Sequence, residues 1–451
     1  MLTLPDIFVQ RTKDMLGSEF SDFEAALNRA APVSLRKNPR KFADFTGSEN
    51  IEWCDSGIYL PQRTVFTLDP DFHAGAYYIQ EASSMFLEQA VKQYCQDKNK
   101  VIALDLCAAP GGKSTHLLSL LPENSLLVAN DTIHSRIKIL YENILKWGHS
   151  NAVITCNDPS RFASLTCFFD LILVDAPCSG EGMFRKDSNA VKEWSIDNVK
   201  LCAERQRRIL ADIWTALKPG GLLVYCTCTY NKEENEENMK WMTDNFGAKS
   251  LQVKTQPQWG VSENSFHENF SYRFYPHKTK GEGFCLHVLS KNGSNKYFPE
   301  KKENNRKKYI AKNLNFVRKY LLNSDKYDFV IENCVVKAIP KELANEINIV
   351  SNRLKCVSSG ITAGTVKGND FVPSHAVALS ADLNIAEFPK INLDRHAALK
   401  FLHKDNMRFD CETAGYNLVC HNNNTLGWIK NIAGRANNLY PREWRILMDI
   451  S

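Results

Sequence analysis

Three cysteines occupy positions from which covalent chemistry could be carried out. Cys178 follows Pro177 in the stretch DAPCSGEG, and Cys226 and Cys228 lie in the stretch YCTCTY. The first stretch follows an apolar run and the second lies at the end of another, and such runs are typical of buried strands. Neighbouring parallel strands end at the same edge of a sheet. Two thiols at one edge suit the activation of an electron-poor ring, because one thiolate adds to the ring and a second group helps to release the adduct. The alternatives for Cys178 and Cys228 are a disulfide or a metal pair, and Cys226 is predicted to be a buried structural thiol.

Four aspartates recur at or just after the ends of predicted strands: Asp105, Asp131, Asp158 and Asp175. An acid about 20 residues beyond a glycine loop is the usual partner of ribose hydroxyls, and Asp131 follows Gly111 by that interval. The pattern favours a nucleoside-like cofactor, without choosing between a nicotinamide and an adenosyl one. The alternative is that these acids only cap helices.

The stretch LDLCAAPGGKSTHLL predicts a strand, a glycine turn and the start of a helix. Such a turn lets the backbone approach a ligand closely at the amino terminus of the helix. A phosphate-binding loop of the Walker A type is a weaker interpretation, because Cys107 stands where that motif requires its first glycine.

Strand and helix patterns alternate between residues 76 and 290. The predicted strands are KVIALDL, SLLVAND, NAVITCND, FDLILVDAP and LLVYCTCTY, and the long helix DNVKLCAERQRRILADIWTALKPGG ends at Pro219 and two glycines. The alternation predicts an α/β fold with a Rossmann-like, doubly wound, mostly parallel sheet. The stretch EGFCLHVLS (282–290) is predicted to add an antiparallel edge strand, and YYIQEASSMFLEQAVKQY an amphipathic helix.

The 451 residues are enough for two or three domains. We predict a helical, then irregular region at 1–75, the α/β domain at 76–290, a lysine-rich linker at 291–312, a small mixed α/β domain at 313–390 and a β-rich module at 391–451. Residues 291–451 hold 25 Lys and Arg against 16 Asp and Glu, whereas the first 290 residues hold 31 against 35. A basic half favours a polyanion partner. The alternative is a solvated linker, since KKENNRKK supplies much of the excess.

The compartment can also be predicted. The first residues lack the pattern of a signal peptide, and no segment has the roughly 18 apolar residues that a membrane span requires. The chain holds 14 cysteines without paired CxxC spacing. We therefore predict a cytoplasmic protein with reduced thiols, no structural metal and no membrane contact.

The stretches CAAPGGK, DAPCSGEG and TCT occur in that order, and on them the chain resembles the Nop/Sun family of S-adenosylmethionine-dependent RNA (cytosine-5) methyltransferases. YYIQEASSM, ERQRRIL and YRFYPHKTKGEGF are similar to its bacterial ribosomal-RNA branch, the RsmF-like branch. The resemblance covers residues 5–290 strongly. It is weaker in the tail, where NLYPREWR is similar to a PUA-like domain. A class I methyltransferase fold with small mixed α/β and PUA-like C-terminal modules is implied.

The resemblance also implies roles for individual residues. Cys228 would attack carbon 6 of a cytosine, Cys178 would promote release after methyl transfer, and Asp175 would hold the edge of the base. Lys113 would position base or cofactor. S-adenosylmethionine would contact Cys107, Ala108, Ala109, Pro110, Gly111, Gly112 and Lys113 around its methionine moiety, Asp131 at the ribose and Asp158 at the adenine, with Asp175 nearby.

The substrate of such an enzyme must be single-stranded or flipped out of a helix. Phe184 is predicted to stack on a flanking base, or else to anchor its loop in the core, and Arg185 and Lys186 to hold phosphate. Residues 1–75 are predicted to be an N-terminal RNA-binding region, with contacts between the RNA backbone and Arg36, Asn38 and Lys41, and the PUA-like module at 391–451 is predicted to bind RNA as well.

The expected partner is RNA, most directly ribosomal RNA, bound by a monomer. Two alternatives remain: a cytosine-5 methyltransferase of tRNA, and a catalytically silent RNA-binding scaffold. Retention of the rim cysteines, the lysine and the acids together argues against the scaffold.

Overall fold

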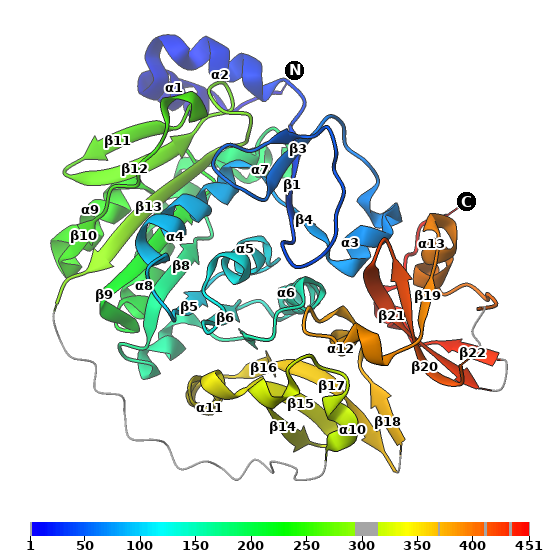
Figure 1. The fold of residues 1–451 in the computed structure, drawn as a ribbon. Coiled ribbons are helices and arrows are strands. Elements are labelled where there is room, and N and C mark those ends of the chain that lie inside the picture. The colour runs from blue at the N-terminus through cyan, green and yellow to red at the C-terminus, as the bar shows by residue number, and fades with distance from the viewer. Residues whose placement is uncertain (1, 294–313, 369, 410–412, 433–434, 451) are drawn as a thin grey trace.

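In the described part of the chain, the strands form four β-sheets with helices around them (Figure 1). The computed structural model describes residues 2–293, 314–368, 370–409, 413–432 and 435–450. One sheet has ten strands and the other three have four each. Among the helices of these residues, none is both long and apolar enough to cross a lipid bilayer.

Five parallel strands form the centre of the ten-stranded sheet. In spatial order they are β9 (Leu217–Thr227), β8 (Phe169–Asp175), β5 (Ile102–Asp105), β6 (Leu126–Asn130) and β7 (Ala152–Thr155). The order along the chain reverses between β5 and β8, and sheets of this type bind ligands at such a reversal. The predicted Rossmann-like α/β fold is confirmed.

Antiparallel strands extend this sheet on both sides, so the sheet as a whole is mixed. β13 (Phe284–Lys291) pairs with β9 on one side. On its other side β13 pairs with β12 (Asn269–Phe274) and with the short β10 (Ala248–Ser250), and β12 pairs in turn with β11 (Ser262–Phe266). At the opposite edge β16 (Cys356–Ser359) pairs with β7. The predicted strand at 282–290 therefore exists, but its edge position is wrong because the hairpin β11–β12 covers it. Pro219, predicted to end the preceding helix, lies inside β9.

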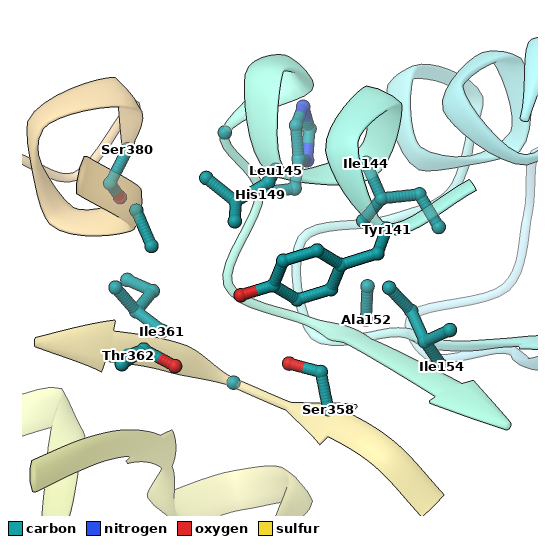
Figure 2. A pocket seen from close by; sticks show the side chains of 13 residues that line it. Tyr141, Ile144, Leu145, His149, Ala152, Ile154, Ser358, Ile361, Thr362 and Ser380 are labelled. Atoms are coloured by element: carbon teal, nitrogen blue, oxygen red, sulfur yellow. The ribbon is translucent and has the colours of Figure 1, made fainter. Parts of the chain in front are cut away.

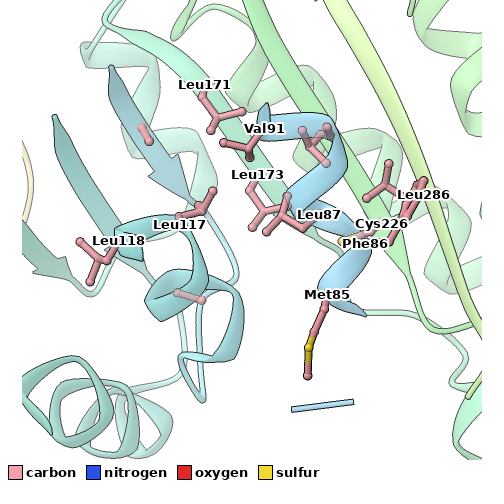
Figure 3. Packing of buried hydrophobic residues seen from close by; sticks show 14 of the residues in the cluster. Met85, Phe86, Leu87, Val91, Leu117, Leu118, Leu171, Leu173, Cys226 and Leu286 are labelled. Carbon is pink, nitrogen blue, oxygen red and sulfur yellow. The ribbon is translucent and has the colours of Figure 1, made fainter. Parts of the chain in front are cut away.

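Helices cover both faces of the ten-stranded sheet. The first face is packed by α4 (Leu87–Cys95), α5 (Gly112–Leu120) and α6 (His134–Trp147), and the second by α8 (Ile196–Trp214), α9 (Glu236–Phe246) and α11 (Ala344–Arg353). Figure 3 shows side chains of α4 and α5 against Leu171 and Leu173 of β8. Because both faces are covered, the central strands are apolar at nearly every position.

The amino-terminal region contains a sheet that was not predicted. After α1 (Asp6–Leu16) and α2 (Phe20–Leu27), the strands β2 (Glu49–Asn50), β3 (Gly57–Leu60), β1 (Val33–Lys37) and β4 (Tyr77–Ile79) pair in this order, with α3 (Pro70–Ala74) between β3 and β4 along the chain. Strands of two to five residues have too few alternating positions to be recognised. The predicted helix that begins at Tyr77 is thus β4 at its start, and becomes helical only later.

The carboxyl-terminal half forms two further sheets. The first contains β14 (Tyr327–Glu332), β15 (Val335–Pro340), β17 (Ile361–Lys367) and β18 (Asp370–Pro373), and the second β19 (Lys390–Asn392), β20 (Gly415–His421), β21 (Asn424–Ile432) and β22 (Arg435–Asn438). The short helices α7 (Ser188–Glu193), α10 (Asn315–Arg318), α12 (His375–Leu379) and α13 (Arg395–His403) complete the described elements of regular α-helix. The predicted linker at 291–312 lies mostly outside the described residues.

The carboxyl-terminal half packs directly on the ten-stranded sheet. The amide of Ala381 donates to the carbonyl of Gly148 at the end of α6 over 2.9 Å, and Arg40 forms an ion pair with Asp382 at 2.7 Å. A small pocket lies at this junction (Figure 2). It is lined from α6, β7, β16, β17 and α12, and includes none of the predicted site residues.

Candidate active site

The four predicted aspartates lie along one edge of the sheet. Asp175 ends β8 and Asp105 ends β5, while Asp131 follows β6 directly and Asp158 lies three residues beyond β7. Since these strands are neighbours in the order β8, β5, β6 and β7, the acids form a row across the reversal of strand order. Their predicted common edge is therefore observed.

The glycine loop joins β5 to α5 at the middle of this row. Gly111 has φ of 116°, a left-handed conformation that favours glycine, and α5 begins at the next residue. A Cβ atom at Gly112 would lie only 3.1 Å from the ring of Tyr78 in β4. The unpredicted amino-terminal sheet therefore forms one wall of the loop.

Asp131 and Asp158 differ in their surroundings. The Asp131 carboxylate is buried and accepts backbone N–H bonds from Ile133 at 2.9 Å and from Ala109 of the glycine loop at 3.2 Å. Asp158 is exposed and accepts from the amide and hydroxyl of Ser160, at the start of a 3₁₀ helix. Asp158 caps its 3₁₀ helix, whereas Asp131 closes a turn onto Ile133, the residue before α6, and ties the glycine loop to β6.

Asp105 has one oxygen that the described residues leave without a partner. Its Oδ2 accepts from the Ser114 hydroxyl at 2.6 Å, whereas its buried Oδ1 accepts nothing. Burial raises the pKa of this carboxyl to about 7, with the negative charge of Asp175 acting in the same direction. A ligand that carries a cation or N–H donors would supply the missing partner.

Lys113 and Asp175 form an ion pair beside the glycine loop. Lys113 Nζ lies 2.7 Å from Asp175 Oδ2 and 5.4 Å from the centre of the Phe284 ring. Burial disfavours the charged ammonium of Lys113 and so lowers its pKa, but attraction to the Asp175 carboxylate has the larger effect. The pKa of Lys113 therefore lies above its usual value. The two residues predicted to contact base or cofactor are thus charged and in direct contact.

The two rim cysteines meet at the ends of β8 and β9. Cys178 Sγ and Cys228 Sγ are 3.0 Å apart, and both are free thiols. The hydrogen bond with Cys228 and burial together raise the pKa of Cys178. Cys226 is fully buried, and its thiol donates to Asp175 Oδ1 at 3.4 Å. The predicted proximity of Cys178 and Cys228 and the predicted burial of Cys226 are both observed.

Of the two roles predicted for Phe184, the structure shows the anchor in the core and not the stacking on a base, and Arg185 does not have its predicted role of holding phosphate. Phe184 is 1% exposed and packs edge-on against Phe8 of α1. Arg185 forms a buried ion pair with Glu282 at 2.9 Å and donates to the carbonyl of Gly281. Phe8 and Glu282 lie far from this loop in the sequence, so the contacts of Phe184 and Arg185 with them anchor the loop. Neither side chain points out toward RNA.

Arg36, Asn38 and Lys41 are also internal. Arg36 is fully buried, and its guanidinium donates to the Thr115 hydroxyl at 2.6 Å and to the Gly112 carbonyl at 3.2 Å. Asn38 donates to the carbonyls of Gly75 and Trp147, and Lys41 Nζ to those of Ala74 and Lys146. The predicted RNA contacts are wrong: these side chains hold the first turn of α5 and the carboxyl end of α6.

Two buried groups of side chains among the described residues could in principle hold a metal ion: Cys54 with Glu88 and His116, and Glu236 with Cys285 and His287. In each group the carboxylate already pairs with a cation, Glu88 with Lys92 at 2.7 Å and Glu236 with Arg273. These cations supply the positive charge that a metal would bring.

Two glutamates behind the thiols, Glu181 and Glu234, were not predicted as site residues, and they are only 2% and 0% exposed. In the sequence they stand in SGEG and NKEEN, stretches that look like solvated loops. Only the pairing of β8 with β9 brings them together.

Family models match three successive parts of the chain. Residues 4–82 match the N-terminal domain of 16S rRNA methyltransferase RsmF, residues 93–290 match 16S rRNA methyltransferase RsmB/F, and residues 388–446 match the methyltransferase RsmF PUA domain. Over these three parts, the chain is similar to the RsmB/F methyltransferases. The resemblance drawn from CAAPGGK, DAPCSGEG and TCT is thereby confirmed.

Curated proteins similar to this chain include the ribosomal RNA small subunit methyltransferases F of Aliivibrio fischeri and Pectobacterium atrosepticum. They are 36% and 34% identical over 313 and 309 residues, which is 64% and 65% of this chain and 65% and 63% of the relatives. The chain thus spans less than two thirds of the length of these relatives.

Solved structures show the same fold. A methyltransferase homolog protein from Pyrococcus horikoshii is 29% identical, with a TM-score of 0.55 over 64% of this chain and 96% of that one. NSun6 from the same organism, solved with SFG, has a TM-score of 0.54 at 20% identity over 64% and 99% of the two chains, which shows the fold alone.

Proposed function

We propose that this protein transfers a methyl group from S-adenosylmethionine to carbon 5 of a cytosine in ribosomal RNA, in the cytoplasm. The observation that carries the proposal is the pair of free thiols, 3.0 Å apart, at the strand ends next to the Lys113–Asp175 ion pair. A binding module has no use for two thiols, a lysine and a carboxylate at one site. The names of the relatives, which are ribosomal RNA small subunit methyltransferases, support RNA of the small subunit as substrate.

In the proposed reaction Cys228 acts as the nucleophile. Its thiolate adds to carbon 6 of the cytosine, which makes carbon 5 nucleophilic. Asp175 and Lys113 hold the edge of the base near N3 and N4 while negative charge develops on the ring. Release requires loss of the carbon 5 proton as the bond between carbon 6 and sulfur breaks, and Cys178 promotes this step. The carbon 5 proton needs an acceptor, and the raised pKa of Cys178 makes its thiolate a stronger base for that proton as the bond between carbon 6 and sulfur breaks.

S-adenosylmethionine supplies the methyl group, and the row of four aspartates at the strand ends fits this cofactor. The unpaired Oδ1 of Asp105 suits the amino group of a methionine moiety beside the loop Cys107–Lys113. We assign Asp131 to the ribose and Asp158 to the adenine.

The proposed activity can be tested directly. Full-length protein should bind S-adenosylmethionine in a calorimetric titration and transfer labelled methyl groups to small-subunit ribosomal RNA, with 5-methylcytidine as the product after nuclease digestion. The Cys228→Ala protein is the control for background transfer. Binding of the cofactor without any 5-methylcytidine in ribosomal RNA would contradict the proposal.

Asp131→Ala should weaken the binding of S-adenosylmethionine about ten- to a hundredfold. A charge-assisted hydrogen bond is worth about 1.5–3 kcal/mol, and each factor of ten in affinity is about 1.4 kcal/mol. The measurement is calorimetry with the isolated protein. Asp187→Ala is the matched control, since Asp187 likewise accepts from the backbone amide two residues further on, that of Asn189. Equal dissociation constants for both variants would leave Asp131 with a local structural role only.

Replacing Arg442 and Arg445 by Gln should flatten the salt dependence of RNA binding. Both side chains are exposed in the PUA-like module, and removing one phosphate-binding cation should reduce the slope of log affinity against log salt by about 0.7–0.9. Filter binding at several salt concentrations gives the slope. The control is Lys430→Gln, because Lys430 is already paired with Asp370 at 2.7 Å. An unchanged slope in the double variant would exclude these arginines from the docking surface.

A further inference from the structure

Each of the two loops that carry the thiols also carries a buried glutamate that binds the other loop. The first loop (177–182) follows β8 and contains Cys178 and Glu181. The second (228–234) follows β9 and contains Cys228 and Glu234. The amide of Gly182 in the first loop also donates to the carbonyl of Cys228 in the second, at 2.9 Å.

Glu181 holds the residues that follow Cys228. Its Oε2 accepts from the Thr229 hydroxyl at 2.6 Å and from the amides of Tyr230 at 2.7 Å and Asn231 at 2.9 Å. Its Oε1 accepts from the indole N–H of Trp194 at 3.0 Å. Four donors thus converge on a single carboxylate, and three of them belong to the opposite loop.

Glu234 holds the residue that follows Cys178. Its carboxylate accepts from the amide of Ser179 at 3.0 Å, from Gln206 at 2.7 Å and from Asn231 at 2.8 Å. Gln206 also donates to the carbonyl of Pro177, which precedes the thiol. The hydroxyls of Ser179 and Thr229 are 3.0 Å apart, so the two residues that follow the thiols are in contact.

From this reciprocal arrangement we infer that Glu181 and Glu234 are positioning residues that hold Cys178 and Cys228 at the separation required to act on one base. The inference rests on the proposed function. The carboxylates do not touch the sulfur atoms. They fix the backbone next to each thiol, and buried carboxylates are retained only where enough hydrogen bonds offset their desolvation.

Adjacent glutamates provide a matched test. Glu234→Gln and Glu181→Gln place an amide NH₂ against N–H donors and so break the arrangement at nearly constant volume. Glu233→Gln is the control, because the Glu233 carboxylate pairs with Arg11 of α1 at 2.6 Å instead. We expect kcat for methyl transfer to fall about 100-fold in the first two variants, as misplacement by about 1 Å can cause. The KM for S-adenosylmethionine should stay unchanged, and Glu233→Gln should behave as the wild type.

A second measurement reads the thiol pair without methyl transfer. Phenylarsine oxide condenses with two neighbouring thiols, forming two As–S bonds and releasing one water molecule. Wild-type protein should bind it at Cys178 and Cys228, as located by peptide mass spectrometry with Cys228→Ser as the control. The Glu181→Gln and Glu234→Gln proteins should bind it at least tenfold more weakly at this pair.

Folded variants that keep both the wild-type kcat and the wild-type arsenical affinity would overturn the inference. If a glutamine variant does not fold, Thr229→Val removes the hydroxyl that donates to Glu181 and contacts Ser179, leaves both carboxylates in place, and is judged by the same two measurements. If wild-type protein binds the arsenical but never methylates RNA, the proposed function fails, and the arsenical affinities of the variants still decide whether the glutamates position the thiols.

Discussion

Cys228→Ala should abolish methyl transfer and leave the affinity for S-adenosylmethionine within a few-fold of the wild type, whereas Cys178→Ala should accumulate a covalent protein–RNA adduct. In the proposed mechanism the first variant lacks the nucleophile, so carbon 5 would not be activated. The second variant would still attack carbon 6 through Cys228, but it would lack the group proposed to promote release. Both thiols lie at the rim, outside the glycine loop, which explains why binding of the cofactor should persist.

The adduct is visible as a gel shift that resists denaturant, and RNA labelled with tritium at carbon 5 of cytosine reports the proton loss that accompanies release. Tritiated water should appear with the wild type and be strongly reduced with either variant. If Cys228→Ala traps the adduct and Cys178→Ala does not, the two roles are exchanged.

Deletion of residues 291–451 should destabilise the remaining chain severely. The sequence alone suggests that residues 76–290 form a separate domain able to bind the cofactor without the tail. However, β16 forms the edge of the central sheet, and the buried core on its second face includes six apolar tail residues, namely Val330, Ile339, Leu343, Ile347, Val350 and Leu354. Burial of such a side chain contributes about 1.5–3 kcal/mol, while whole domains have only about 5–15 kcal/mol.

Circular dichroism and size-exclusion chromatography of a fragment of residues 1–290 test this expectation. The soluble yield and the melting temperature of the fragment should both be far below those of the full chain. Co-expression with residues 313–451 as a separate polypeptide is the control and should restore the folded methyltransferase region. A monomeric 1–290 fragment with the same melting temperature as the full-length protein would contradict the expectation. Because of this dependence, the docking of RNA is better tested by the arginine substitutions than by truncation.

The site was predictable where the chemistry follows strand ends. Asp105, Asp175 and the thiols each follow an apolar run, and the rule that parallel strands end together is enough to gather them. The burial of cations was not predictable in this way. Arg36 and Arg185 are basic residues in polar stretches, yet each is internal because a partner distant in the sequence offsets its desolvation: Thr115 for Arg36 and Glu282 for Arg185.

The fold was predictable between residues 76 and 290, since strands buried on both faces are apolar over their whole length. It was not predictable where strands are short. β4 and β16 have three and four residues, too few for a period-2 pattern, and both pair with strands far away in the sequence. β16 joins the carboxyl-terminal half to the ten-stranded sheet, and β4 completes the amino-terminal sheet.

The late position of β16 in the chain has a consequence for synthesis on the ribosome. β7 ends at Thr155 and its partner strand ends at Ser359, so at about 5–20 residues per second the edge of β7 stays open for roughly 10–40 s. An open edge strand offers unpaired N–H and C=O groups to any other strand nearby. Nascent chains of this protein are therefore expected to need shielding by a chaperone during that interval, and a slow codon run before residue 359 should lower the soluble yield.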